Sequence, residues 1–432
     1  MKIKGVVLGV AGAFAVTGAQ AADLPAAAAP EPVDYVRVCD AFGAGFFYVP
    51  GTETCLKISG YVRAEYDAGI TQSSGSHWGN QLNYGDKDSN GYRFRARGDA
   101  RFDVRTNTEF GLLRSYIEIY LQNDTGTPNG ENTGAALDKG YIQFGGLTAG
   151  QAQSFYDFFT GFGYNSIYEP AHSDTSTNLL AYTYTFGNGF SLTGSLEDSS
   201  SRNTSVTDPI TGKDIYGGNR YPDIVGAFQI AQGWGSAQLS AAGHAVAVNS
   251  AWQNAVSNGL ANGNTSDTYG YAVQLGTIIN LPFLGQGDQF ALQGAFAQGA
   301  TKYVSPQAYV TYGNSFDTYS EGLPDAYVNP LSGSLELVTS WSVSAGLNHY
   351  FTPQISAALE GSYLGANVDL PNASGTVVNN FNGTLTVNYT PVENMNIGAA
   401  LEYVNVAPSN DGTSGLKASN SLIGLVRLQR NF

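Results

Sequence analysis

Apolar and polar residues alternate along much of this chain, most clearly between positions 92 and 105. One series of alternate positions consists of Tyr92, Phe94, Ala96, Gly98, Ala100, Phe102 and Val104. The intervening series consists of Arg93, Arg95, Arg97, Asp99, Arg101, Asp103 and Arg105. A period of two places these two series on opposite faces of a β-strand. Because no buried core would accept the charged face, the pattern predicts a strand that lies between lipid and water.

The same period predicts about sixteen strands over the whole chain. They cover 57–67, 92–106, 111–122, 138–144, 147–153, 179–186, 190–197, 223–230, 234–246, 268–280, 288–299, 335–350, 354–367, 376–389, 394–406 and 417–432. An even number of strands in this range is typical of the single-chain barrels of bacterial outer membranes.

The connections between these strands alternate in length. Long connections cover 68–91, 123–137, 198–222, 249–267 and 300–333, and short ones cover 107–110, 145–146, 187–189, 351–353 and 391–393. Gly, Pro and Asn, which tight turns require, are frequent in the short connections. A soluble β-sandwich also has turns, but it lacks this regular rhythm. The predicted fold is therefore all-β, a transmembrane antiparallel β-barrel with turns at one end and loops at the other.

Both ends of the chain agree with export to an outer membrane. Lys2 and Lys4 precede a short apolar run that ends in the small-residue segment Ala19-Gln20-Ala21, which predicts a signal peptide over 1–21. No later stretch reaches the length of about 20 apolar residues that a membrane-spanning helix needs. The chain ends on Phe432 after a last alternating segment, as the closing strand of a barrel would.

Aromatic side chains are predicted to form two girdles at the membrane interfaces. The residues concerned are Tyr66, Tyr92, Tyr363 and Tyr403 near the long loops, and Phe144, Phe351, Tyr389 and Phe432 near the short turns. The alternative is that strands simply favour aromatic residues.

Composition restricts the domain organisation and the partners. Charged residues make up 13% of the chain, against about 25% in soluble domains, and the formal net charge of −15 argues against nucleic acid as a partner. No Pro-rich linker divides the chain after residue 57. We therefore expect one barrel domain over 57–432, preceded by an N-terminal periplasmic segment over 22–56.

A barrel of about sixteen strands is too wide for its own side chains to fill, so it encloses an aqueous channel. The connection over 154–178 is unusually aromatic and carries Asp157, Glu169 and Asp174, which predicts a constriction loop that folds inward. The water-facing series on the first three strands supplies the opposing arginines Arg63, Arg93, Arg95, Arg97, Arg101 and Arg114.

Carboxylates and guanidinium groups on opposite sides of a narrow pore would set a field across it, because little room remains for screening. With the negative net charge, we expect a mild preference for cations. The alternative is that the arginines form salt bridges that stiffen the wall, with Asp99, Asp103, Glu65 and Glu118 as partners.

Cys39 and Cys55 are the only cysteines of this exported chain. An oxidising periplasm favours a disulfide, and closing a loop of about 17 residues is worth about 3 kcal/mol in the chain-entropy model. Metal binding would need further ligands, and no histidine lies near them in sequence. A pair of free thiols is the remaining alternative.

Other chemistry has little support. His77, His172, His244 and His349 are scattered, and no metalloprotease, nucleophile-elbow or phosphate-loop motif is present. The segment from Asp86 resembles half of a calcium loop, but Arg97 stands where the bidentate glutamate belongs. We expect no enzymatic activity, no cofactor and no metal. The rival functions are a substrate-specific channel and, in another class, an outer-membrane hydrolase or adhesin barrel.

The block from Val38 to Arg63, which reads VCDAFGAGFFYVPGTETCLKISGYVR, closely resembles the opening of the alphaproteobacterial general porins of the rhizobial type. The resemblance implies a sixteen-stranded homotrimer in the outer membrane, with the loop over 154–178 in the position of the inward-folded third loop. It also implies that Phe432 resembles the recognition signal for the barrel-assembly machinery. The other partners implied are membrane lipid, lipopolysaccharide and small hydrophilic solutes. Small outward residues favour packing of a neighbouring subunit, for example Ala237, Ala241, Gly243 and Ala245.

Overall fold

The structure is a computed structural model and describes residues 37–72, 91–127, 130–164, 170–208, 213–261, 263, 266–305, 309–312, 319–329, 332–370, 373–408 and 419–432. The chain divides into two units, Met1–Arg37 and Val38–Phe432, and all the described secondary structure belongs to the second. The predicted signal peptide over 1–21 lies outside the described residues.

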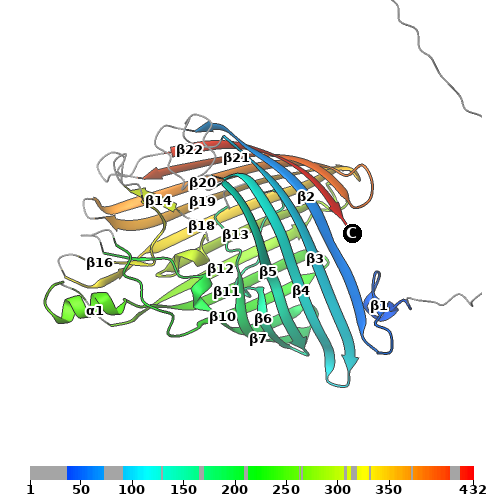
Figure 1. Ribbon diagram of the computed structural model, residues 1–432, viewed down its shortest axis with the longest axis horizontal. Helices are drawn as coiled ribbons and strands as arrows, with labels where there is room; N and C mark the ends of the chain where they lie inside the picture. The colour runs from blue at the N-terminus through cyan, green and yellow to red at the C-terminus, as the bar shows by residue number, and fades with distance from the viewer. Residues whose placement is uncertain are drawn as a thin grey trace, which may run out of the picture. The chain divides into compact units, whose positions relative to one another are not determined.

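One antiparallel sheet of seventeen strands forms the body of Val38–Phe432 (Figure 1). The two-residue strand β1 (Phe47–Tyr48) only borders β2. The other sixteen strands are β2 (Cys55–Gln72), β3 (Tyr92–Thr108), β4 (Gly111–Thr127), β5 (Gly130–Phe144), β6 (Leu147–Gln153), β7 (Ser176–Gly187), β8 (Phe190–Glu197), β10 (Asp223–Gln232), β11 (Gly235–Val246), β12 (Thr268–Asn280), β13 (Gln289–Gln298), β18 (Thr339–Thr352), β19 (Ile355–Leu370), β20 (Ala373–Tyr389), β21 (Met395–Pro408) and β22 (Ser419–Asn431).

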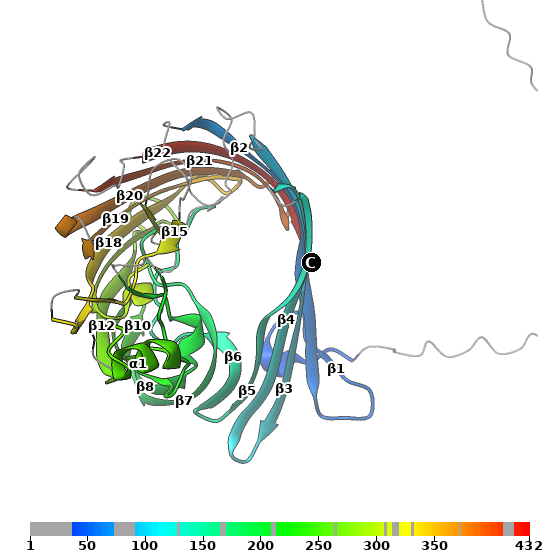
Figure 2. The same ribbon diagram turned by 60° about the vertical axis from the view of Figure 1, so that its left-hand side comes forward.

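These sixteen strands form a closed barrel (Figure 2). Each strand pairs antiparallel with its neighbours, and β2 pairs with β22 from Tyr61 opposite Asn431 to Gln72 opposite Ser421. The predicted β-barrel of sixteen strands is therefore confirmed.

The period of two separates lipid-facing from inward-facing side chains along each strand. On β19, Leu359 is 58% exposed, whereas its neighbours Ala358 and Glu360 are 2% and 6% exposed. Exposed aromatic residues gather at both ends of the wall, as predicted. Tyr66 and Phe94 pack with ring centroids 4.9 Å apart at the loop end, and Phe110 and Phe144 pack at 6.3 Å at the turn end.

The largest departures from the predicted bounds are in two strands. The predicted strand over 335–350 is divided, because Leu335–Leu337 (β17) pairs with a loop strand and only Thr339–Thr352 (β18) belongs to the wall. The strand predicted to begin at Asp138 begins at Gly130 instead, and β4 ends at Thr127, so the long connection predicted over 123–137 is wrong. A register shift explains the second difference: Glu118 faces Lys139 and Ile119 faces Leu137, so Asp138 is an extra residue that interrupts the alternation.

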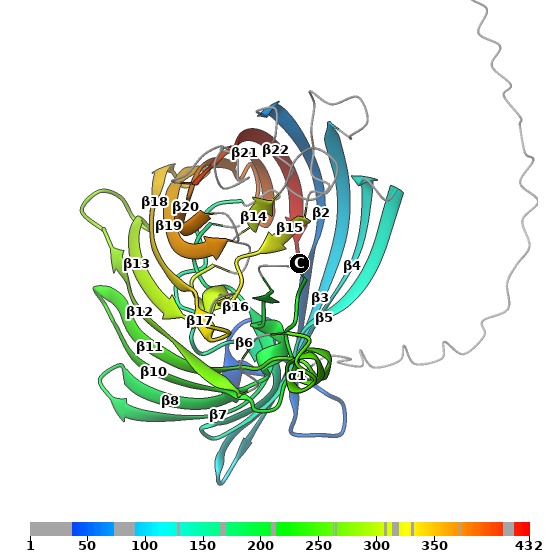
Figure 3. The ribbon, with the colours of Figure 1, turned by 90° about the vertical axis from the view of Figure 1, so that its left-hand side faces the viewer.

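The long connections fold together at the loop end, where Figures 1 and 3 show α1 and β16. The strands β9 (Val206–Thr207), β16 (Ala326–Val328) and β17 form a three-stranded sheet. The remaining loop elements are α1 (Ser250–Ser257), η2 (Ser199–Ser201), η3 (Thr301–Tyr303), β14 (Tyr309–Tyr312) and β15 (Tyr319–Gly322). Val206, Val246 and Trp252 form a small apolar core there. No described helix has the length and apolarity that a membrane crossing requires.

The predicted disulfide between Cys39 and Cys55 is present, with the Cα atoms 6.0 Å apart. It ties the segment that contains η1 (Asp40–Phe42) to the first residue of β2. At the same end of the barrel, Phe432 and Gly60 exchange two backbone hydrogen bonds of 3.0 Å, while the Phe432 side chain remains exposed. The chain terminus is thus fixed to the first wall strand.

Candidate channel constriction

The connection between β6 and β7, residues 154–175, folds into the barrel, and we call it the inner loop. Its residues 154–164 and 170–175 are described. Near its start, Ser240 on β11 and Gln274 on β12 donate hydrogen bonds to the Tyr156 carbonyl, at 2.8 and 2.9 Å. Phe159 N then donates to Gln293 Oε1 on β13, at 2.9 Å. The predicted inward fold of this loop is confirmed.

The inner loop then continues along the wall to β19 and β20. Glu360 on β19 accepts hydrogen bonds from the backbone of Phe162 and, at 2.8 Å, of Gly163. Tyr164 N donates to Thr386 Oγ1 on β20 at 3.0 Å. The buried carboxylate of Glu360 therefore satisfies two loop amides that would otherwise lack partners.

Small wall residues make room for the aromatic side chains of the inner loop. A Cβ atom added at Gly276 on β12 would lie 2.5 Å from Phe158, and one added at Gly346 on β18 would lie 2.8 Å from Phe159. Such distances are shorter than van der Waals contact. The rings of the loop thus pack directly on the backbone of the wall.

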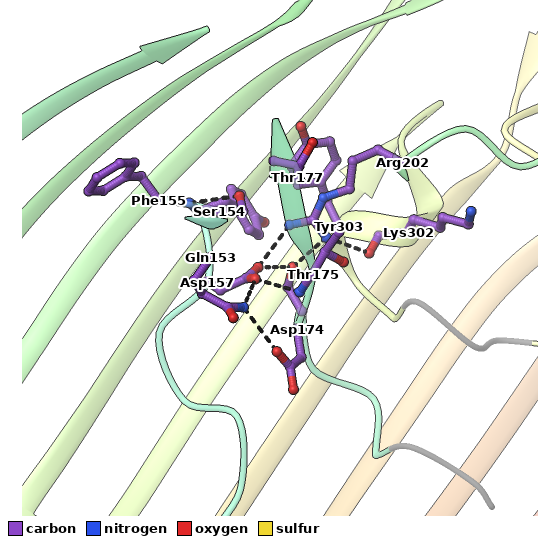
Figure 4. A network of polar contacts seen from close by, with 12 residues as sticks. Gln153, Ser154, Phe155, Asp157, Asp174, Thr175, Thr177, Arg202, Lys302 and Tyr303 are labelled. Carbon is purple, nitrogen blue, oxygen red and sulfur yellow. Dashed lines mark hydrogen bonds and ion pairs between the residues drawn. The ribbon is translucent and has the colours of Figure 1, made fainter. Parts of the chain in front are cut away.

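The loop base is fixed by Asp157, whose side chain is 1% exposed (Figure 4). Its carboxylate accepts hydrogen bonds from Gln153 Nε2 at 2.5 Å, from Thr175 N at 2.7 Å and from the Ser173 hydroxyl. Arg202, which follows η2, completes the set with Nη2 at 2.8 Å from Asp157 Oδ1. Asp157, predicted to line the pore, therefore lies within a network that holds the loop.

Arg202 joins the inner loop to two further connections. Its Nη1 donates to Ser173 Oγ at 2.7 Å and to the Lys302 carbonyl at 3.2 Å. Its guanidinium lies 4.3 Å from the centroid of the Tyr303 ring, and its side chain has no exposed area. One buried cation thus connects the inner loop to the segments that contain η2 and η3.

The other loop groups have different surroundings. Asp174 is exposed and accepts a hydrogen bond from Gln153 Nε2 at 2.9 Å. Glu169 lies outside the described residues. His172 is buried, and because burial disfavours the charged imidazolium, its pKa falls to about 4. Of the three predicted loop carboxylates, Asp174 is the one described residue that is open to water.

Most of the predicted arginines form ion pairs along the inner wall of β2, β3 and β4, and we call this surface the arginine wall. The pairs are Arg93–Asp67 at 2.6 Å, Arg95–Asp124 at 2.8 Å, Arg101–Asp99 and Arg101–Glu118 at 2.8 Å, and Arg114–Asp103 at 2.9 Å. Arg105 shares Asp103 at 2.7 Å. The salt-bridge alternative therefore describes much of this wall.

Arg63 and Arg97 have amide partners instead. Arg63 Nε donates to Gln429 Oε1 at 2.8 Å, and Arg97 Nε donates to Gln122 Oε1 at 2.7 Å. Among the described residues, the closest carboxylate to the Arg63 guanidinium is that of Glu65, at 3.8 Å. Arg97 forms no ion pair with any of the described residues. These two side chains face each other in register across β2 and β3.

Arg427 on β22 links Tyr164 of the inner loop to the arginine wall. The Arg427 guanidinium lies 3.8 Å from the centroid of the Tyr164 ring, and its Nε donates to Glu65 Oε1 at 2.6 Å. Arg427 and Glu65 are direct neighbours in the pairing of β22 with β2. The inner loop therefore reaches the arginine wall through Arg427, next to Glu65 and Arg63 on β2.

Sequence reasoning did not include Arg202, Glu360 or Arg427 in the site. Arg427 and Glu360 carried a signal, because each is a charged residue in the water-facing series of its strand. Arg202 gave no such signal, because the connection that contains it shows no alternation of apolar and polar residues. Among the described residues, no group of three or more His, Cys, Asp or Glu side chains could hold a metal ion.

Comparison with known proteins adds family and fold relationships. A family model described as "Porin subfamily" matches residues 23–423. Porin Omp2b of Brucella suis biovar 1 is 40% identical over 247 residues, which is 55% of this chain, and porin Omp2b of Brucella melitensis biotype 1 is 39% identical over the same length. The chain spans 64% of the length of each of these relatives.

A solved structure shares the fold. The outer membrane channel DcaP of Acinetobacter baumannii superposes with a TM-score of 0.65 and 16% sequence identity, over 89% of this chain and 99% of that one. At this identity the likeness concerns the fold alone.

Proposed function

This chain is an outer-membrane β-barrel that belongs to the porin subfamily, and we propose that it forms a water-filled channel for passive diffusion of small hydrophilic solutes and ions. The family match also confirms the resemblance carried by Val38–Arg63. From this premise, the inner loop and the arginine wall take specific roles.

One observation carries the proposal: the inner loop narrows a barrel that its wall side chains alone would leave open. The loop is held to β11, β12, β13, β19 and β20 by hydrogen bonds. Charged side chains cover the facing wall of β2, β3 and β4. A narrow passage lined by charges and hydroxyls favours hydrated solutes over apolar ones.

In this proposal the lining residues are Arg63, Arg93, Arg95, Arg97, Arg101 and Arg114 on the wall, and Glu169 and Asp174 on the inner loop. We assign Asp157 the role of an anchor, because its charge is compensated by Arg202. Charges that line a pore act through the local potential, so those without a close counter-charge have the largest effect on ion selectivity.

Reconstitution in a planar bilayer tests the function. The purified barrel should produce stable conductance steps, and liposomes that contain it should take up small neutral sugars faster than large ones. Absence of conductance from correctly folded barrel would contradict the channel and favour the alternative of a hydrolase or adhesin barrel. Block of the current by one solute at low concentration would favour a substrate-specific channel.

We further propose that the barrel is a homotrimer. The small residues of β11 that favour packing lie on its outward face, where Leu239 is 54% exposed. Light scattering in mild detergent should give three times the mass of the chain plus bound detergent. A monomer under conditions that preserve conductance would contradict this proposal.

The remaining proposals concern export and assembly. Residues 1–21 serve as a signal peptide, Phe432 serves as the signal for the barrel-assembly machinery, and the outer wall contacts lipid and lipopolysaccharide. Sequencing the N-terminus of the mature protein tests the first of these proposals.

A further inference from the structure

We propose that Arg63 and Arg97 form a binding subsite for small solutes that carry an oxyanion, either a phosphate or a carboxylate group. The inference rests on the proposed channel function and names a class of solute for it. The subsite lies on the inner wall of β2 and β3, near Arg427, which contacts Tyr164 of the inner loop.

Two like charges face each other at this place in the wall. Arg63 and Arg97 are directly opposite in the antiparallel pairing of β2 with β3, a position where Cβ atoms lie roughly 4.5–5.5 Å apart and like charges destabilise a sheet. Other facing pairs on these strands combine opposite charges: Lys57 with Asp103, Glu65 with Arg95, and Asp67 with Arg93.

A second pair of facing arginines shows how this wall normally compensates such a clash. Arg105 and Arg114 are also opposite each other, on β3 and β4. Both bind the carboxylate of Asp103, at 2.7 and 2.9 Å. No described carboxylate bridges Arg63 and Arg97 in this way. Their repulsion is therefore a cost that an anion between them would remove.

At hydrogen-bond distance, neutral amide groups hold the two guanidinium groups. Gln122 Nε2 donates to Asp124 at 2.6 Å and Gln429 Nε2 donates to Asn431 at 2.7 Å. Because these amide nitrogens are engaged, each amide oxygen faces a guanidinium group. An amide oxygen accepts a hydrogen bond but does not neutralise the charge.

Tyrosine rings stack on both guanidinium groups and fix their planes. Arg63 lies 4.5 Å from the ring centroid of Tyr61, and Arg97 lies 4.3 Å from that of Tyr120. Stacking leaves the edge of each plane for hydrogen bonding and reduces the entropy lost on binding. Within the described part of the chain, Arg63 Nη2 and Arg97 Nη1 donate to no other group, so donors remain for a ligand.

The local charge balance points the same way. Arg95 and Arg427 lie beside this pair, and their ion-pair partners are Asp124 and Glu65. Four guanidinium groups therefore face two carboxylates, which leaves two positive charges. Planar guanidinium groups bind phosphate and carboxylate through paired, charge-assisted hydrogen bonds, whereas a neutral sugar cannot compensate their charge.

The test is equilibrium binding of inorganic phosphate to the refolded full-length barrel in detergent, measured by calorimetry. Arg97→Gln should raise the dissociation constant about tenfold, as expected for the loss of one charge-assisted hydrogen bond. Arg97→Lys keeps the charge without the planar fork and should give an intermediate value. Acetate should compete with phosphate, because both present oxyanion oxygens.

Arg105→Gln is the matched control, since it also removes one positive charge from the inward face of β3. Arg105 is bound to Asp103 at 2.7 Å, and Asp103 keeps Arg114 as a partner at 2.9 Å, so the loss of Arg105 should change the dissociation constant less than about twofold. Equal losses of affinity in the Arg97→Gln and Arg105→Gln variants would mean general electrostatic attraction and would overturn the subsite. Wild-type barrel without measurable phosphate binding would do the same.

Binding is measured without current, so the two proposals fail separately. A barrel that binds phosphate but conducts no ions would contradict the channel and leave the subsite in place. A conducting barrel with the same phosphate affinity in wild type and Arg97→Gln would refute the subsite alone. Heat-modifiable migration on gels verifies that each variant is folded.

Discussion

Replacing Arg202 by methionine should weaken the attachment of the inner loop to the barrel wall. The substitution removes hydrogen bonds to Asp157 at 2.8 Å, to Ser173 at 2.7 Å and to the Lys302 carbonyl at 3.2 Å. The Asp157 carboxylate keeps three neutral donors but loses its only counter-charge among the described residues. The Asp157 side chain is only 1% exposed, so water cannot replace that counter-charge. Breaking a buried ion pair on one side costs about 3–5 kcal/mol.

This magnitude predicts a measurable change in the pore. A loss of about 3 kcal/mol lowers the ratio of wall-bound to released inner loop by roughly a hundredfold, because 1.4 kcal/mol is a factor of ten. Single channels of Arg202→Met should show greater open-channel noise than wild type, and liposomes should admit larger neutral sugars. The double variant Asp157→Asn/Arg202→Met should lie closer to wild type, since no buried charge is left unpaired.

An exposed ion pair on the same barrel provides the control. Arg220 lies 2.9 Å from Asp267, but its side chain is 61% exposed, and such pairs contribute about 0–1 kcal/mol. Arg220→Met should therefore behave as wild type. If Arg202→Met also keeps the wild-type noise and sugar cut-off, Arg202 does not hold the inner loop and the reasoning is refuted.

Three further predictions concern Phe432, Gly346 and His172. Deleting Phe432 removes its two hydrogen bonds with Gly60 and should lower the amount of folded barrel in the outer membrane; unchanged abundance of the heat-modifiable form would contradict an assembly role. Gly346→Leu places a side chain where Phe159 packs and should change single-channel conductance, whereas Gly361→Leu, on the lipid-facing side of β19, should leave it unchanged. Burial lowers the pKa of the His172 imidazole to about 4 from 6.5, so His172 binds a proton more readily when the inner loop is released from the wall. Lowering the pH from 6.5 towards 4 should therefore shift the equilibrium towards the released loop. Open-channel noise that rises over this pH range in wild type but not in His172→Phe would support this prediction. Equal rises in both proteins would contradict it.

The barrel could be predicted from the sequence because lipid and water impose a period of two on every wall strand. The strands at Leu147–Gln153, Phe190–Glu197 and Thr268–Asn280 have the predicted bounds. The prediction is less accurate where the alternation is broken, as at the extra residue Asp138 in β5. At Val338 the chain leaves the loop sheet and enters the wall without any change in pattern.

The constriction could be predicted only in part. Alternation placed Arg63 and Arg97 on the inner face, because each strand position determines which way its side chain points. It could not tell that Asp157 meets Arg202, since those residues lie on separate connections and meet only through tertiary contacts. The partner of each wall arginine also depends on register, which the sequence leaves open.

The pairing of β2 with β22 makes the completed barrel depend on the whole chain. Arg63 and Gln429, which share a hydrogen bond across this seam, are 366 residues apart in sequence. Contacts of such separation form late, because a long loop must be closed before they are made. A chain that ends early keeps two unpaired strand edges, and free edges bind other strands. Quality control in the periplasm would therefore meet an unfinished chain as an open sheet, and a finished one as a barrel whose first and last wall strands are paired.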